Sequence, residues 1–470
     1  MPSIADVRPV LLSAPYADPE TNLEVQRHLQ SGYRTCGLVE ITVDDGTTGL
    51  GEGYLAVFAP RVFESIIRLL APTLIGRDVR DIGPIVDDLL SMTGYWSRQG
   101  AAQHAVSAIE IALQDCRAKH LGVPVYELLG GAHHHPIKMY GSGGDSTTPP
   151  AMREELDYLV DRGIDLFKIR TRKDQVDKAV WCLREGQKRG IRIAIDMTQN
   201  LANPAQTASD AAAFVEEIEE RSGASVYFLE EALGPVDIAS YPLLRAKTNT
   251  RIAGGETVTT ADELCDRIGQ GLYDLAQPDA TVIGGIGKVM EVFAAARRHG
   301  REVVVHCWGG PVGMMANFHA ALAGGGRLAE WPMPRFPLRE AMAREPWQLE
   351  EGRLTVPDLP GLGVELTEEI ENRFSFREDA VYTCLVEEDE TPVDGRWHRR
   401  RHRYTNKKLT LLRRRRQSSV EAGEKVASPE PPAGTFKQAR SKGRPSGGVA
   451  SSGARPVGAS ERMLTEVATR

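Results

Sequence analysis

The sequence lacks the cysteine patterns that mark disulfide scaffolds and structural zinc sites. Its six cysteines are scattered along 470 residues, and no two of them form a CxxC pair. Isolated cysteines of this kind indicate reduced thiols in a cytoplasmic protein.

Long apolar runs and an excess of positive charge are absent as well. No uninterrupted apolar stretch approaches the roughly 20 residues that span a bilayer, so no membrane segment is expected. Residues 1–15 contain no basic segment followed by an apolar run, which argues against a signal peptide. A net charge of −7 argues against nucleic acid as the main partner. With 41% hydrophobic and 26% charged residues, the composition is that of a soluble globular protein.

The first 130 residues have the pattern of an α+β module. Alternating side chains predict strands at 4–14, 38–43 and 48–53, with a turn at Asp44-Asp45-Gly46 before the third strand. Apolar residues at i, i+3, i+4 spacing then predict helices at 62–70, 82–92 and 101–121. Gly122 and Pro124 end the last of these helices in the expected way.

From Pro136 the pattern changes to alternating strands and helices. Short apolar runs predict eight strands, at 137–140, 166–170, 191–196, 226–231, 251–256, 273–277, 302–306 and 327–331. Helical segments such as 175–188 and 288–299 separate them. Eight strand–helix units predict an α/β protein with a (β/α)8 barrel at residues 131–354. A doubly wound open sheet is the alternative, and it fits less well because no phosphate-binding glycine motif follows the first strand.

Two further segments complete the chain. Residues 355–386 contain short β-like pieces that we expect to pack back on the module of residues 1–130. Residues 387–470 are poor in apolar side chains and carry acidic (387–390) and basic (399–403, 413–416) clusters, so we predict a disordered tail. The basic clusters would suit a tether to nucleic acid or an anionic surface. A dispensable extension or a shifted reading frame is the interpretation that we favour.

Three carboxylates follow successive strands of the predicted barrel. Asp196, Glu230 and Glu256 each lie at the end of a short apolar run. Because the C-terminal ends of neighbouring parallel strands converge, the three side chains are expected to meet at one point. Like charges crowded together are unstable unless a cation lies between them, and hard oxygen ligands suit Mg²⁺ best. The sequence therefore predicts a magnesium site, with Glu231 facing the other way in a supporting role.

Ionisable groups end the other strands too. Lys168 and Arg170 share one face of the second strand, because side chains alternate along a strand. Asp279, His306 and Glu330 stand at the ends of the sixth, seventh and eighth strands. Each of them alone has an ordinary structural explanation, such as a helix cap or a hydrogen-bonded core residue. The ordered set lies where barrels carry their active sites and predicts a catalytic centre.

The order of these residues resembles the enolase superfamily, in particular its mandelate racemase and muconate lactonizing enzyme-like branch. The resemblance covers residues 4–385 and rests on these motifs: Lys168-Ile169-Arg170, Ile195-Asp196, Leu229-Glu230-Glu231-Ala232, Gly254-Gly255-Glu256, Gln277-Pro278-Asp279 with Ile283-Gly284-Gly285, His306-Cys307-Trp308-Gly309 and Glu330-Trp331. It implies that the first 130 residues cap the barrel mouth and that the protein is a symmetric homo-oligomer. The roles it implies are Mg²⁺ ligands for Asp196, Glu230 and Glu256, a general base for the His306–Asp279 pair, and a donor to a substrate oxygen for Glu330.

One departure from the family pattern bears on the mechanism. The family usually has a second lysine where this chain has Arg170, and arginine stays protonated, so it is not an ordinary base. Racemisation by two bases is therefore doubtful, and a one-base reaction through His306 is expected. Lys168 and Arg170 would then anchor a substrate carboxylate or hydroxyl. Lys168 would be the base instead if repulsion from Arg170 lowered its pKa. Thr198 and Ala232 are smaller departures that leave the metal site intact.

These features predict a Mg²⁺-dependent lyase that dehydrates a sugar acid, an aldonate or an aldarate. His306 would remove the α-proton, and the β-hydroxyl would leave from an enediolate that the metal stabilises. A cycloisomerase or a racemase/epimerase of the same superfamily is the near alternative. The alternative from another functional class is a barrel without catalytic activity whose tail binds a partner. We expect substrate selectivity to depend on the capping segment around residues 21–33 and on the barrel loops.

Overall fold

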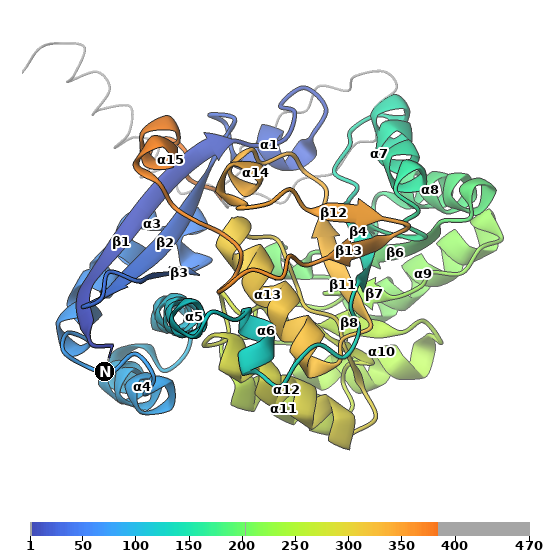
Figure 1. Cartoon of the computed structure of the whole chain (residues 1–470). Helices are drawn as coiled ribbons and strands as arrows, with labels where there is room; N and C mark the ends of the chain where they lie inside the picture. The colour runs from blue at the N-terminus through green and yellow to red at the C-terminus, as the bar shows by residue number, and fades with distance from the viewer. Residues whose placement is uncertain (1, 203, 384–470) are drawn as a thin grey trace, which may run out of the picture. The chain divides into compact units, whose positions relative to one another are not determined.

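The structure is a computed structural model of the chain and describes residues 2–202 and 204–383 (Figure 1). The predicted tail at 387–470, with its basic clusters, lies outside the described residues. The five cysteines within the described ranges are free. No helix in these ranges is long and apolar enough to cross a membrane.

The N-terminal module is an antiparallel meander covered by helices. β1 (Ile4–Pro15), β2 (Tyr33–Val43) and β3 (Thr48–Glu52) pair in sequence order. An apolar core separates the sheet from α3 (Pro60–Leu70), α4 (Ile82–Ser97) and α5 (Ala101–Leu121). α5 approaches β3 closely because Gly51 has no side chain, and a Cβ there would overlap the carbonyl oxygen of Ala108. The predicted α+β module is confirmed.

Short elements complete this module and lead into the barrel. α1 (Leu23–His28) lies between β1 and β2, and α2 (Leu55–Phe58) follows β3. α6 (Val125–Leu128) follows α5 and precedes the first barrel strand.

Eight parallel strands form the barrel. They are β4 (Ile137–Gly143), β5 (Leu166–Arg170), β6 (Arg192–Asp196), β7 (Leu229–Glu230), β8 (Ile252–Gly254), β9 (Leu275–Ala276), β10 (Glu302–Val303) and β11 (Leu328–Pro332). Neighbours from β4 to β10 pair in sequence order, and β11 pairs with β4, which brings the last strand beside the first. The predicted barrel is therefore confirmed, and the open-sheet alternative is wrong.

A helix follows each strand. These helices are α7 (Pro149–Asp161), α8 (Val176–Arg189), α9 (Ala208–Ser222), α10 (Tyr241–Lys247), α11 (Ala261–Gly269), α12 (Ile286–Arg298), α13 (Pro311–Gly324) and α14 (Leu338–Met342). Side-chain alternation separates the barrel interior from this helical layer. On β5, Leu166 belongs to the inner apolar cluster, whereas Phe167 and Ile169 join the larger core beneath the helices. Lys168 and Arg170 thus share the inner face with Leu166, as predicted.

Several strands that carry the predicted site are shorter than expected. β7, β9 and β10 each have two residues in the ladder, whereas runs of five or six residues were predicted. After β7 the backbone turns at Glu231, whose φ is +41°. After β9, Pro278 has no N–H group to donate to a neighbouring strand. The backbone therefore limits β7 and β9 at their C-terminal ends, and the predicted residues 226–228 and 273–274 lie outside the ladder at their N-terminal ends.

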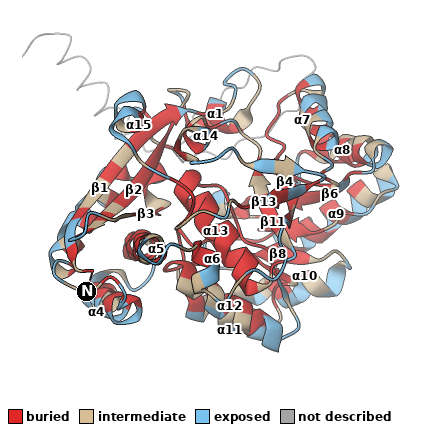
Figure 2. Cartoon of the chain, viewed as in Figure 1, coloured by how far each residue is buried: buried red, intermediate tan, exposed pale blue. Residues whose placement is uncertain are grey.

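Buried carboxylates of the N-terminal module bind helix N-termini of the barrel. Glu52, at the end of β3, accepts hydrogen bonds from the backbone nitrogens of Gly310 (2.5 Å) and Gly313 (2.7 Å) at the start of α13. Glu110 on α5 does the same for α12, with the nitrogens of Ile286 at 2.7 Å and Gly287 at 3.0 Å. α13 is buried along its whole length (Figure 2). These bonds satisfy N–H groups that have no partner within their helix.

The chain returns to the N-terminal module after the barrel. The hairpin of β12 (Gln348–Glu350) and β13 (Arg353–Thr355) pairs with β4, and α15 (Glu368–Arg373) follows. The Ser13 nitrogen donates to the Phe374 carbonyl (2.8 Å), and Thr35 Oγ1 donates to the Ala380 carbonyl (2.6 Å). With these contacts as support, we propose the predicted division into a cap of residues 1–130, completed by 355–386, and a barrel of residues 131–354.

Candidate active site

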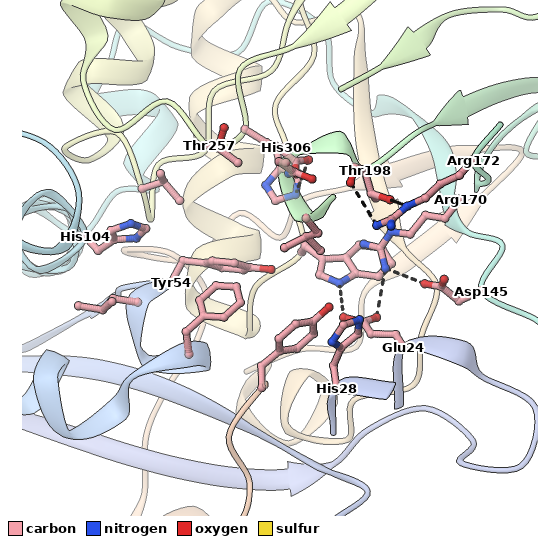
Figure 3. A pocket seen from close by; sticks show the side chains of 18 residues that line it. Glu24, His28, Tyr54, His104, Asp145, Arg170, Arg172, Thr198, Thr257 and His306 are labelled. Carbon is pink, nitrogen blue, oxygen red and sulfur yellow. Dashed lines mark hydrogen bonds and ion pairs between the residues drawn. The ribbon is translucent and has the colours of Figure 1, made fainter. Parts of the chain in front are cut away.

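The C-terminal ends of the barrel strands and the cap enclose a cavity of about 250 Å³ (Figure 3). The cap contributes side chains from α1, from the segment around α2 and from the start of α5. The barrel contributes Arg170, Thr198, Glu256, His306 and Trp308. Among the predicted site residues, Arg170, Glu256 and His306 line the cavity. The others lie beneath it and are 0–2% exposed: Lys168, Asp196, Glu230, Asp279 and Glu330.

His306 and Asp279 form a buried pair. Asp279 Oδ2 lies 2.8 Å from His306 Nδ1, and Asp279 Oδ1 accepts from Asn317 Nδ2 (2.9 Å) and Thr281 Oγ1 (2.7 Å). Burial raises the pKa of Asp279, but these hydrogen bonds and the charge of His306 outweigh it and hold the pKa below its usual range. Asp279 is thus an ionised acceptor that makes His306 Nδ1 the donor nitrogen. His306 Nε2 lies on the other side of the ring, 3.4 Å from Glu256 Oε2.

The charges around His306 control its protonation. Burial lowers the pKa of His306, but the carboxylates of Glu256, Glu330 and Asp279 outweigh it and raise the pKa to about 10. In this arrangement of charges, the His306 ring is an imidazolium at neutral pH. It can serve as a base only where the surrounding negative charge is compensated.

The three predicted metal ligands come from adjacent strands. Asp196 ends β6 and lies opposite Glu230, which ends β7. Glu256 lies two residues beyond the end of β8. Burial and the neighbouring carboxylates raise the pKa of Asp196 and raise that of Glu230 well above its ordinary value. The three side chains therefore share one strongly negative environment.

Each of these carboxylates is engaged by a protein group. The pairs are Lys168–Glu230, Arg170–Asp196 (Nε to Oδ2, 3.5 Å) and Asn200–Glu256 (Nδ2 to Oε1, 2.6 Å). Within residues 2–202 and 204–383, no three His, Cys, Asp or Glu side chains stand close enough together to hold a metal ion as placed. The donor set nevertheless fits Mg²⁺ chemically, because it consists of hard carboxylate oxygens whose repulsion a divalent cation would relieve. An ionised carboxylate accepts more than one partner, so these contacts can persist beside a bound ion.

Lys168 lies between two acids inside the barrel. It forms an ion pair with Glu230 and lies 2.8 Å from Glu330 Oε1. Burial lowers the pKa of Lys168, but Glu230 and Glu330 outweigh it and hold the pKa well above its ordinary value. The condition under which Lys168 would act as a base, a pKa lowered by Arg170, is therefore not met.

Glu330 differs from the role that the resemblance implies. Its Oε2 accepts from the Cys307 nitrogen (2.6 Å), and its Oε1 faces Lys168. Burial raises the pKa of Glu330, but Lys168 and His306 outweigh it and bring the pKa below its usual range. An ionised carboxylate accepts hydrogen bonds and donates none. Donation by Glu330 to a substrate oxygen does not match this arrangement.

Arg170 is held by acids from three directions. Its Nη1 lies 2.6 Å from Asp145 Oδ2 and 3.3 Å from Glu24 Oε2, and its Nε lies 3.5 Å from Asp196 Oδ2. The face of the guanidinium is 4.1 Å from the ring of Trp308. A cation that is already paired in this way is a poor anchor for a substrate carboxylate, so the anchoring role predicted for Arg170 does not fit its contacts.

Sequence reasoning missed Glu24, Asp145 and Trp308, which surround Arg170. Trp308 belongs to the His306-Cys307-Trp308-Gly309 motif, but the sequence analysis assigned it no role. Asp145 follows the true end of β4 at Gly143, three residues later than the predicted end of that strand. Glu24 has no local signal that distinguishes it from the other acids of the cap, although it lies in the segment where selectivity was expected.

Two known protein families match this chain. Residues 26–130 match the mandelate racemase / muconate lactonizing enzyme N-terminal domain, and residues 151–370 match the enolase C-terminal domain-like family. A D-gluconate dehydratase from Thermoproteus tenax is 30% identical over 381 residues, which cover 77% of this chain and 73% of that protein. The chain belongs to the enolase superfamily. Within it, the chain is an enzyme of the mandelate racemase and muconate lactonizing enzyme-like branch.

Other members of the superfamily have similar sequence identity to this chain and cover a similar share of it. A D-galactarolactone cycloisomerase from Agrobacterium fabrum is 27% identical over 358 residues, 72% of this chain and 90% of that protein. The solved structure of L-talarate/galactarate dehydratase from Salmonella typhimurium LT2, liganded with Mg and L-lyxarohydroxamate, is 26% identical with a TM-score of 0.68. It covers 79% of this chain and 93% of its own. These three relatives are two sugar acid dehydratases and a cycloisomerase.

Proposed function

We propose that this enzyme is a Mg²⁺-dependent dehydratase of sugar acids that works with one base, His306. The observation that carries the proposal is the buried Asp279–His306 pair at the cavity, together with Arg170 at the position where a second lysine base would stand. Arginine keeps its proton, so it leaves His306 as the group that can accept one. The dehydratases among the relatives support the same reaction class.

The proton transfers follow from the tautomer of His306. Because Nδ1 is held by Asp279, Nε2 is the atom that would take the α-proton, and the ionised Asp279 would stabilise the imidazolium that results. The same Nε2–H would give its proton to the departing β-hydroxyl where both groups lie on one face of the substrate. Loss of water yields an enol, which becomes a 2-keto-3-deoxy acid without any oxidant or reductant.

The proposed metal ligands are Asp196, Glu230 and Glu256. When bound there, Mg²⁺ would supply positive charge beside the substrate carboxylate, where negative charge develops as the α-proton leaves. Asn200 contacts Glu256, and Thr198 follows Asp196 at the cavity wall, with its backbone nitrogen 2.7 Å from Asp196 Oδ1. These neighbours would orient the carboxylates.

A cycloisomerase is the second candidate, because one of the relatives carries that activity on D-galactarolactone. It would use the same α-proton abstraction but would return a ring-opened or ring-closed isomer without loss of water. The non-catalytic alternative loses its support, since the chain belongs to an enzyme superfamily. Partner binding by residues 387–470 stays a prediction, as do a cytoplasmic location and a homo-oligomeric state.

A screen of the purified protein against sugar acids and lactones would test the proposal. With Mg²⁺ present, a dehydratase produces a 2-keto-3-deoxy acid that a carbonyl reagent detects, and EDTA abolishes the signal. An isomer of unchanged mass, with no keto acid, would favour the cycloisomerase. If neither product formed from any sugar acid or lactone in the screen, the proposal would be contradicted.

A further inference from the structure

Tyr54 is a residue of the cap that lies beside the proposed base. It stands directly before α2 and lines the cavity together with His306. The two rings meet edge to face, with centroids 6.2 Å apart. Figure 3 shows the Tyr54 side chain pointing into the cavity below His306. The cap therefore places a phenol next to the group that would take the α-proton.

The hydroxyl of Tyr54 is a hydrogen-bond donor that the protein does not use. Arg34 Nη2 donates to the Tyr54 hydroxyl oxygen at 3.3 Å. Among the residues that the structure describes, no group accepts the hydroxyl proton in return. Burial raises the pKa of Tyr54, and Arg34 offsets only part of this effect. The phenol thus keeps its proton at neutral pH and can donate it to a bound molecule.

Arg34, on β2, is a buried cation without a carboxylate partner. It is 1% exposed, and its guanidinium lies 4.9 Å from the ring of Tyr16, 5.6 Å from that of Tyr54 and 5.9 Å from that of Phe336. Within residues 2–202 and 204–383 it forms no ion pair, and its Nη1 has no hydrogen-bond partner. Burying an unpaired cation is costly. The same charge would stabilise negative charge that develops on the Tyr54 oxygen.

The backbone of Tyr54 is attached to the loop that holds Asp279. The Tyr54 nitrogen donates to the Thr281 carbonyl at 3.3 Å. Thr281 Oγ1 in turn donates to Asp279 Oδ1 at 2.7 Å. One loop of the barrel therefore positions both the phenol and the carboxylate behind His306.

The basic side chains at the cavity fit the role of a proton donor less well. Arg170 and Arg172 are arginines, which keep their protons. Burial lowers the pKa of His104 to about 4, so its imidazole is neutral. His104 is hydrogen-bonded to the backbone of Thr281, and its Nδ1 has no hydrogen-bond partner in the described part of the chain. A neutral ring that donates through Nε2 offers only an acceptor at Nδ1.

Tyr382 also lines the cavity, but its ring has different neighbours. It stacks on His28 with centroids 4.5 Å apart and meets Phe58 edge to face at 5.2 Å. Its rings in contact are thus those of the cap, whereas the Tyr54 ring contacts His306 itself.

We propose that Tyr54 is the general acid that protonates the departing β-hydroxyl, and that Arg34 is a positioning residue that orients the Tyr54 hydroxyl and stabilises the phenolate. The Arg34–Tyr54 pair is then the counterpart of the Asp279–His306 pair: a cation supports the acid, and an anion supports the base. This inference rests on the proposed function and adds a second catalytic group to it.

The proposed step balances without an oxidant or a reductant. His306 Nε2 takes the α-proton, the electron pair of the C–H bond forms the double bond between the α- and β-carbons, and the bond from the β-carbon to oxygen breaks. The oxygen leaves as water with the proton of Tyr54 rather than with one from His306. Hydroxide is a much stronger base than a phenolate, so this transfer is favourable. Exchange with solvent then returns a proton to Tyr54 and removes one from His306.

The Tyr54→Phe variant tests the acid role, because it keeps the ring and removes the hydroxyl. The sugar acid that the screen identifies is incubated with Mg²⁺ in D₂O, and NMR measures elimination and α-proton exchange in the same sample. Elimination should fall by about 100-fold or more, while exchange into the remaining substrate persists. The ratio of exchange to elimination therefore rises. Tyr95→Phe, at an exposed position on α4, is the matched control and should change neither rate.

Variants of Arg34 test its positioning role. Arg34→Met removes the charge and should lower kcat by about tenfold or more with little change in KM. Arg34→Lys keeps the charge and should recover part of that loss. In the Tyr54→Phe background, Arg34→Met should lower kcat no further, because its effect acts through the hydroxyl. A purely structural role would give additive losses and would overturn the role of Arg34.

The outcomes separate this inference from the proposed function. Equal elimination by Tyr54→Phe and Tyr95→Phe, in an enzyme that dehydrates its substrate, would overturn the acid role alone. Parallel loss of exchange and elimination in Tyr54→Phe would overturn it as well, since Tyr54 would then act before the hydroxyl departs. A wild-type protein that dehydrates no sugar acid would contradict the proposed function and, with it, the acid role.

Discussion

His306 and Asp279 face each other across 2.8 Å with both side chains buried, and the carboxylate is held by Asn317 and Thr281 on its other oxygen. Because of this geometry, His306 Nδ1 carries the proton that is donated to Asp279. The remaining nitrogen is the one available to a substrate. The proposed chemistry depends on this relationship more than on any other contact.

Replacing Asp279 with asparagine should remove most of the activity while leaving the fold intact. The amide is nearly isosteric but carries no charge to stabilise the imidazolium, so kcat should fall by about two to four orders of magnitude. The rate is measured on the substrate found by the screen. Asp262→Asn, at an exposed position on α11, is the matched control and should retain full activity. Wild-type kcat in Asp279→Asn would mean that His306 does not act as the base.

Mg²⁺ should stabilise the protein through the three strand-end carboxylates. At a concentration about 100-fold above Kd, a bound ion adds about 2.7 kcal/mol to the free energy of unfolding, which corresponds to a rise of about 2–4 °C in Tm. Thermal scans with Mg²⁺ and with EDTA measure this rise. Glu230→Gln should abolish the response, and Glu216→Gln, on the exposed face of α9, should keep it. A full response in Glu230→Gln would place the ion elsewhere.

The junction of cap and barrel should depend on Glu52. Truncation to alanine leaves the nitrogens of Gly310 and Gly313 buried without their acceptor, and each such loss costs about 1–3 kcal/mol. We expect Glu52→Ala to lower the free energy of unfolding by about 2–4 kcal/mol in urea titrations. Glu216→Ala, a solvent-exposed helix position, should change it by less than about 0.5 kcal/mol. Equal stabilities of the two variants would contradict the capping role of Glu52.

Gly144 should tolerate substitution poorly because two constraints coincide there. Gly144 and Gly46 both have positive φ, at +74° and +86°, but a Cβ on Gly46 would meet nothing within 4 Å. Alanine at either position carries the left-handed strain of about 1–2 kcal/mol. Gly144→Ala should lose at least about as much again through its overlap with Ile169, and should also lower kcat/KM by displacing Asp145. Similar unfolding free energies for the two variants would show that the turn can relax.

The barrel and the chemistry of its strand ends were predictable from the sequence, because both arise from local patterns. The strand predicted at 166–170 and the helix predicted at 101–121 have the observed bounds, since alternation and the stop at Gly122 act within a few residues. The pairing of His306 with Asp279 was implied by the resemblance to the enolase superfamily.

The partners of the cations were not predictable in the same way. Arg170 pairs with Glu24, which is 146 residues away in the chain and belongs to the cap, so only the docking of α1 decides this contact. Lys168 was expected to anchor the substrate, but it forms ion pairs with Glu230 and Glu330 inside the barrel. The length of the ladders was not predictable from the apolar pattern either, because residues 226–228 and 273–274 continue the apolar runs but lie outside the ladder.

Exchange of the α-proton tests the central claim most directly. A sugar acid that the screen identifies as a substrate is incubated with the enzyme and Mg²⁺ in D₂O. NMR then follows the loss of the α-proton signal from the remaining substrate and the appearance of deuterium in the product. The account predicts that the wild-type enzyme forms product by breaking the α-C–H bond and that His306→Asn shows neither exchange nor product. Undiminished exchange and turnover in His306→Asn would contradict the assignment of His306 as the base.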